Sequence, residues 1–146
     1  MKTRHRAREL VLQSLYEMDI RGKLSIDNLE DDFFPCLTQE EIDELEDEVK
    51  IYASLLLRGT LSNLEEIDGY ISEFSINRPL TNIDIVDRNI LRLSIYSLLQ
   101  NEVHPHIIID EAVKLSQDFS SYVNYKFING ILDAFQKKYK LEEKFN

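Results

Sequence analysis

Apolar residues recur along this chain at spacings of three and four positions, the period of a helix that is buried on one side. The pattern predicts about seven helices, over residues 3–20, 25–34, 38–59, 64–77, 83–99, 106–119 and 123–140. In the helix of residues 83–99 apolar side chains occupy almost the whole circumference, so we expect it at the centre of the structure. The predicted fold class is all-α, a compact bundle of about seven helices in two packed subdomains.

The length of 146 residues fits one compact domain, and 4 Gly and 3 Pro leave few helix breakers. We expect the two helical halves to cover about residues 1–77 and 78–146. The segment from Asn77 to Thr81 would join them, because Pro79 prevents a helix from continuing through it.

Sequence features that would place the chain in a membrane or an oxidising compartment are missing. Cys36 is the single cysteine, so no disulfide can form within the chain. The basic start is not followed by the apolar segment of a signal peptide, and no apolar run approaches the roughly 20 residues that cross a bilayer. We therefore expect a cytoplasmic protein without membrane attachment.

The formal net charge of −10 is regional. Residues 27–50 contain eleven acidic side chains and one lysine, so the remainder of the chain sums to zero. The first ten residues carry four cations, Lys2, Arg4, Arg6 and Arg8, against Glu9 alone. The overall acidity therefore does not argue against binding of nucleic acid at the N-terminus.

Two of these cations are unusually placed for a surface helix. At about 100° per residue, Arg4 and Arg8 extend the apolar stripe of the first helix, which is tolerable if the helix projects beyond the end of the core. Cations in a first turn also oppose the helix dipole, at a cost of roughly a few tenths of a kcal/mol each, unless an anion binds there. A phosphate site and a frayed basic terminus are both compatible with this pattern.

A second unusual segment is residues 125–132. Asn129 and Gly130 interrupt a strong helical pattern, which indicates close approach of another helix or of a ligand. Lys126 and Phe127 supply a cation and a stacking ring, the pairing that readers of single-stranded RNA use. A core position for Phe127, and a helix contact through Asn129, are the structural alternatives.

The other polar groups do not form a known reaction site. His104 and His106 stand beside a proline without the further ligands of a tetrahedral metal site. The acids of residues 40–48 lie on one amphipathic helix and are expected to form its solvated face. No phosphate-binding glycine loop or nucleophile motif occurs. We therefore expect no catalytic residues, no metal and no cofactor.

Four motifs stand in order along the chain: Arg4-His5-Arg6-Ala7-Arg8-Glu9-Leu10 with Leu15-Tyr16, Val86-Asp87-Arg88-Asn89-Ile90-Leu91-Arg92-Leu93 with Tyr96, Ile109-Asp110-Glu111-Ala112-Val113-Lys114-Leu115, and Lys126-Phe127-Ile128-Asn129-Gly130-Ile131-Leu132. Together they resemble the NusB family of bacterial transcription antitermination factors. The resemblance extends over nearly the whole chain, although residues 21–81 contain none of these motifs.

The resemblance implies a single RNA-binding domain of seven helices and a function without covalent chemistry. It implies binding, together with the small-subunit ribosomal protein NusE, to the single-stranded box A element of nascent ribosomal RNA, within the RNA polymerase antitermination complex. Two sets of residues follow from the motifs, an RNA-binding set and a partner-binding set: Lys2, Arg4, Arg6, Arg8, Lys126, Phe127 and Asn129 for RNA, and Tyr16 and Asp87 for NusE.

Two other functions are compatible with a chain of this kind. One is a homodimeric helical interaction scaffold without direct RNA binding, because some family members are thought to bury the RNA surface in a dimer. The other is a fragment of an RNA cytosine methyltransferase, which the length of the chain argues against. The sequence also departs from the family at residues 120–124, where the family has a glycine-containing, acidic loop that helps to bind NusE.

Overall fold

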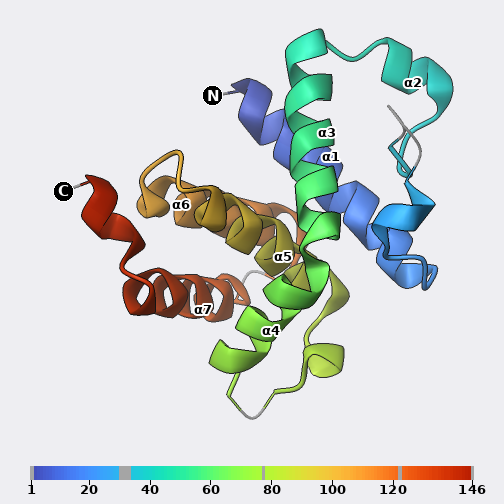
Figure 1. Ribbon diagram of the computed structural model, residues 1–146. Coiled ribbons are helices and arrows are strands. Elements are labelled where there is room, and N and C mark those ends of the chain that lie inside the picture. Colours follow the sequence, from blue (N-terminus) through green and yellow to red (C-terminus); the bar gives the residue numbers. More distant parts are fainter. Residues whose placement is uncertain (1, 30–33, 77, 122, 146) are drawn as a thin grey trace. The chain divides into compact units, whose positions relative to one another are not determined.

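The computed structural model describes residues 2–29, 34–76, 78–121 and 123–145. These residues form seven α-helices and three short 3-10 helices, and no strand occurs among them, which confirms the predicted all-α fold (Figure 1). The elements in order are α1 (Lys2–Ile20), η1 (Ile26–Asn28), α2 (Gln39–Asp43), α3 (Asp47–Ser62), α4 (Leu64–Phe74), η2 (Leu80–Asn82), α5 (Ile85–Gln100), α6 (Pro105–Phe119), α7 (Tyr125–Lys138) and η3 (Leu141–Phe145).

The chain groups into two compact units, unit 1 (Met1–Leu64) and unit 2 (Glu65–Asn146). In unit 1, α1 packs along α3. Their facing sides carry small and branched apolar residues that are almost fully buried: Ala7, Leu10, Val11 and Leu15 from α1, and Ala53, Leu56, Leu57 and Leu61 from α3. This is the one-sided apolar stripe that the spacing of three and four predicts.

The single long helix predicted for residues 38–59 is wrong, because the structure divides this segment into α2 and α3. The predicted capping box is present: Thr38 Oγ1 accepts from the Glu41 N–H at 3.2 Å, and the Thr38 N–H donates to Glu41 Oε1 at 2.9 Å. A continuous helix would align like charges at spacings of three and four. The break instead places Asp47 and Glu48 in the first turn of α3, where the helix dipole stabilises them.

The predicted helix of residues 25–34 is present only as η1. Ser25 caps it as expected, accepting from the Asp27 N–H at 3.2 Å. The backbone is already extended at Leu29, which ends the turn, and residues 30–33 lie outside the described part of the chain. Phe34 is buried, at 1% exposure.

Unit 2 is built around α5, which packs against α6 and α7. Nine of its 16 residues are buried, which confirms the predicted central position. The isoleucine run of residues 107–109 belongs to α6, which starts at Pro105 with the side chain of His104 as its cap.

The helix α4 belongs with unit 2, so the division along the chain falls between Leu64 and Glu65, whereas the sequence pattern predicts it near residue 77. Two aromatic contacts to α7 explain the grouping: the Phe135 ring lies 5.0 Å from that of Tyr70 and 6.1 Å from that of Phe74. Lys138 of α7 also donates to Glu73. Asn77, the first residue of the predicted joint, lies outside the described residues.

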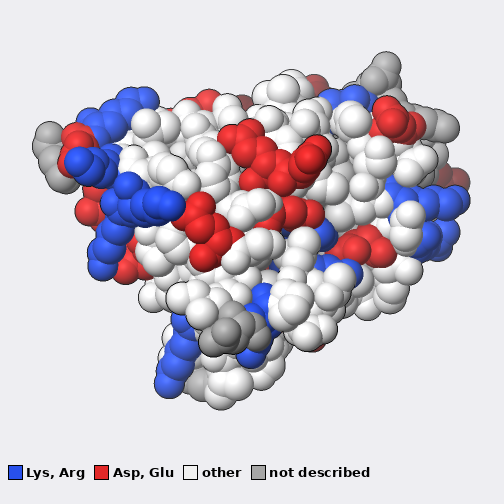
Figure 2. Space-filling view, turned by 60° about the horizontal axis from the view of Figure 1, so that its bottom comes forward, with Lys and Arg blue, Asp and Glu red and all other residues white. Residues whose placement is uncertain are grey.

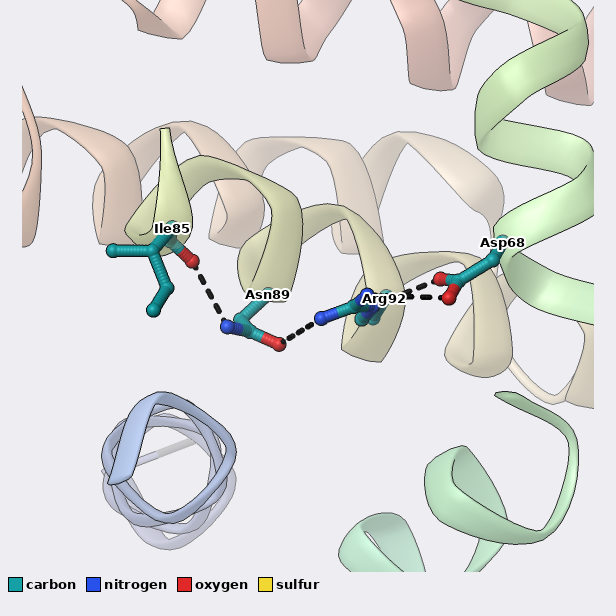
Figure 3. Close-up of polar contacts among 4 residues, drawn as sticks. All are labelled: Asp68, Ile85, Asn89 and Arg92. Carbon is teal, nitrogen blue, oxygen red and sulfur yellow. Dashed lines mark hydrogen bonds and ion pairs between the residues drawn. The ribbon is translucent and has the colours of Figure 1, made fainter. Parts of the chain in front are cut away.

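A buried polar network attaches α4 to α5 (Figure 3). Arg92 forms a two-pronged ion pair with Asp68, with Nε–Oδ1 at 2.8 Å and Nη2–Oδ2 at 3.1 Å. Its Nη1 donates to Asn89 Oδ1 at 2.9 Å, and Asn89 Nδ2 donates to the carbonyl of Ile85 at 2.9 Å. The side chain of Arg92 is 6% exposed, so the network lies largely out of contact with water.

Candidate nucleic-acid interface

The start of α1 presents three exposed cations, Lys2, Arg4 and Arg6. The first turn of this helix contains no acidic residue, so no side chain within it compensates the positive end of the helix dipole. The N-terminal N–H groups and the three cations together form a region that favours an anion.

Tyr52 of α3 organises the two arginines that continue the apolar stripe. The Arg4 guanidinium lies 5.0 Å and that of Arg8 5.9 Å from the Tyr52 ring centroid. Arg8 Nη2 also donates to the Tyr52 hydroxyl at 3.4 Å. The expectation that Arg8 projects beyond the core is wrong: it is 4% exposed, because the tyrosine closes the core around it. Sequence spacing could not show this contact, which joins residues 44 positions apart.

An open hollow of about 320 Å³ adjoins the basic cluster. Lys2, Thr3 and Arg6 line one side of it, and the α2–α3 connection lines the other, with Glu44 and Glu46. Hydrogen bonds from Thr38, with a smaller contribution from the charge of Arg6, hold the pKa of Glu41 below its ordinary value. The acidic segment therefore borders the cations. On the face in Figure 2, acidic side chains gather near the centre and basic ones lie mainly toward the edges, with acidic side chains among them at the left.

In unit 2, α7 presents Lys126, Asn129 and Gly130 to solvent. Phe127 is half-buried, and the Arg78 guanidinium lies over its ring at 4.5 Å from the centroid. Apart from its chain neighbours and the nearby backbone of α7 itself, no described atom lies within 4 Å of the position that a Cβ on Gly130 would occupy. The expectation of a close helix approach at Gly130 is therefore wrong, and packing within the described residues does not explain a glycine there.

The two residues predicted to face a protein partner differ in exposure. Tyr16 of α1 is half-buried, whereas Asp87 in the first turn of α5 is 2% exposed. Asn124, the residue before α7, donates to Asp87 Oδ2 at 2.7 Å, and burial raises the pKa of this carboxyl group. Asp87 Oδ1 is buried without a hydrogen-bond partner among the described residues.

The structure brings the predicted RNA-binding residues together in two sets. One lies at the start of α1 in unit 1, and the other lies on α7 in unit 2. Tyr52 and Arg78, which contact one set each, were missed by the sequence analysis. The segment of residues 120–124 contributes Asn124 and Ser120 to the surroundings of Asp87, and Tyr122 lies outside the described part.

The described residues also bear on metal binding and on membrane crossing. Among the described residues, no group of three His, Cys, Asp or Glu side chains could hold a metal ion. None of the described helices combines the length and the apolar character needed to cross a membrane.

Comparison with known proteins points to one family. The model of the NusB family matches residues 5–137. The transcription antitermination protein NusB of Leptospira biflexa serovar Patoc is 39% identical over 140 residues, which are 94% of each chain. The structure of T. maritima NusB superimposes with a TM-score of 0.78 at 30% identity, over 92% of this chain and 91% of that one. A structure of the antitermination factors NusB and NusE in complex with dsRNA matches with a TM-score of 0.80 at 26% identity, over 95% and 99% of the two chains.

Proposed function

This chain belongs to the NusB family, and from that premise we propose that it is a non-catalytic transcription antitermination factor that binds box A RNA together with NusE. The observation that supports this most directly is the exposed group of Lys2, Arg4 and Arg6 at the start of α1, without an acid in the first turn. It acts as an adaptor within the RNA polymerase antitermination complex, in the cytoplasm.

At α1 the RNA backbone is held electrostatically. Phosphate groups accept hydrogen bonds from the exposed cations and from the free N–H groups of the first helical turn. Arg4 is pre-oriented by the Tyr52 ring, which reduces the side-chain entropy lost on binding. Arg8 is buried beneath it, so its role is to position Tyr52 rather than to contact phosphate.

At α7 the RNA meets a cation, a ring and an amide. Lys126 binds a phosphate, the edge of the Phe127 ring contacts a base, and Asn129 hydrogen-bonds to a base or sugar. The open space around Gly130 lets the RNA backbone approach the helix more closely than a larger side chain would allow.

NusE binding is proposed to involve Tyr16 and Asp87. Tyr16 is partly exposed and can make direct contact. Asp87 is buried, so it acts through Asn124, whose amide it holds in place at the start of α7. A complex in which NusE and RNA bind neighbouring surfaces would show mutual strengthening of the two binding steps.

The proposal is tested by titrating labelled single-stranded box A RNA with the protein, with and without NusE, over a series of salt concentrations. Wild-type protein with NusE should bind, and its affinity should fall steeply with salt. The double variant Arg4→Gln with Arg6→Gln should lose about two phosphate contacts, which lowers the slope of log K against log salt by roughly 1.4. The opposite change, Glu44→Gln with Glu46→Gln, should strengthen binding at low salt because it removes repulsion beside the hollow.

The matched control is Arg21→Gln, which changes an exposed arginine directly after the C-terminal end of α1 that pairs with Glu17. This variant should bind RNA as the wild type does. Absence of RNA binding by the wild-type protein in the presence of NusE would refute the proposal. An unchanged salt slope in the Arg4 and Arg6 variant would refute the assignment of the surface at α1.

A further inference from the structure

We propose that Arg78, whose guanidinium lies over the ring of Phe127, is a further RNA-contacting residue that binds a backbone phosphate beside α7. The inference rests on the proposed RNA-binding function and assigns to it a residue outside the motifs of the sequence. Arg78 belongs to the connection between α4 and η2, and both it and Phe127 lie in unit 2.

The backbone of Arg78 is fixed on both sides of its Cα atom. Its N–H donates to the carbonyl of Ser75 at 3.0 Å, and the Ser75 hydroxyl donates to the carbonyl of Arg78 at 3.0 Å. Ser75 itself is 5% exposed, and Pro79 restricts the conformation of the residue before it. The reciprocal pair ties the backbone of Arg78 to Ser75, the residue that follows α4.

The side chain then crosses the face of an aromatic ring that is anchored on α7. The Arg78 Cζ atom lies 4.5 Å from the centroid of the Phe127 ring, within the range of a cation–π contact. The guanidinium is planar by its own bonding, and the ring contact restricts the orientation in which its N–H donors can meet two oxygens of a phosphate. Because the group is already ordered, binding costs less side-chain entropy than for a mobile lysine.

The positive charge of Arg78 remains available to a ligand. Arg78 is exposed, and among the described residues no carboxylate forms an ion pair with it. Burial raises the pKa of Asp87, and the charge of Arg78 is the smallest of the influences that oppose this rise. Burial is the largest influence on the pKa of Asp87, and among the described residues no hydrogen bond or ion pair joins the Arg78 guanidinium to that carboxyl group.

The position also suits the RNA-binding set on α7. Lys126 precedes Phe127 in sequence and is exposed, and Asn129 and Gly130 are exposed on the following turn. Arg78 adds a second cation to this set, contributed by a different segment of the chain. Two exposed cations in unit 2, one of them over the Phe127 ring and the other next to Phe127 in sequence, could each bind a phosphate of one strand.

The proposal is tested with the variants Arg78→Gln and Arg78→Lys. Their binding of labelled single-stranded box A RNA is measured in the presence of NusE, over a series of salt concentrations. Arg78→Gln should lower affinity about three- to tenfold and reduce the salt slope by roughly 0.7, the value for one phosphate of a single strand. Arg78→Lys should keep the slope and lose part of the affinity, because an ammonium lacks the planar fork. Arg21→Gln serves as the control, and melting of each variant by circular dichroism should match the wild type.

Three outcomes separate the proposals. An Arg78→Gln variant with wild-type affinity and wild-type salt slope would overturn the role of Arg78 while leaving the proposed function standing. A loss of affinity without a change of slope would also overturn it, because no phosphate contact was removed. If the wild-type protein itself does not bind this RNA with NusE, the proposed function fails and takes the inference with it.

Discussion

Removing the carboxylate of Asp68 should destabilise the protein strongly, although this residue is not part of either RNA-binding set. In Asp68→Ala the Arg92 guanidinium loses two hydrogen bonds of 2.8 and 3.1 Å and keeps Asn89 Oδ1 as an acceptor. The Arg92 side chain is 6% exposed, so its charge would stay in a largely buried site after losing its ion-pair partner.

The magnitude follows from the burial of the two partners. Breaking a buried ion pair by removing one partner costs about 3–5 kcal/mol. The side chain of Asp68 is 24% exposed, and the space it leaves lets water reach the guanidinium, so we expect about 2–3 kcal/mol. For a chain of this size that corresponds to a melting temperature lowered by roughly 5–10 °C.

Urea denaturation followed by far-ultraviolet circular dichroism measures this free energy. The matched control is Asp110→Ala, which breaks an i,i+4 pair with His106 whose two side chains are 62% and 67% exposed, and should cost less than about 0.5 kcal/mol. Replacing both members by apolar residues, Asp68→Leu with Arg92→Met, should recover part of the loss. Equal unfolding free energies for Asp68→Ala and Asp110→Ala would refute the reasoning.

Two further predictions concern α7 and α5. Gly130→Ala should raise the unfolding free energy by about 1 kcal/mol, because the added methyl group meets open space and alanine favours a helix. The same variant should lower RNA affinity. A variant less stable than the wild type would contradict the prediction. Burial raises the pKa of Asp87, so the folded chain binds a proton at this carboxyl group more tightly than the unfolded chain does. The contribution of Asp87 to stability therefore falls as pH rises through the raised pKa. Asp87→Asn should therefore gain stability relative to the wild type between acidic and neutral pH, measured by urea denaturation at several pH values; a constant difference would be inconsistent with the raised pKa.

Local sequence patterns predicted the helices well where apolar spacing dominates. The central position of α5 and the capping box at Thr38 follow from short-range chemistry, and both are present. The prediction failed for residues 38–59, where apolar spacing favours one helix and the repulsion among the acids favours two. Spacing rules weigh the apolar face and ignore the charges, so the break was not anticipated.

In the candidate site, too, local motifs identified some of the residues and missed others. The motifs marked Lys126, Phe127 and Asn129 as a set, but the support beneath Phe127 comes from Arg78 on another segment. In the sequence, Arg78 before Pro79 indicated only the end of a helix. No local pattern connects the two residues, because the contact depends on how α4 and α7 pack within unit 2.

The sequence by itself determined the helical class, the regional placement of the acids and the cationic start of α1, because these depend on neighbouring residues and on composition. Only the tertiary structure decided which cations face solvent. Arg8 and Arg4 lie one helical turn apart on the same face and both contact the ring of Tyr52 from α3, yet Arg8 is buried and also donates to the Tyr52 hydroxyl, whereas Arg4 is exposed. Burial is a property of what packs over a residue, and that partner comes from a distant part of the chain.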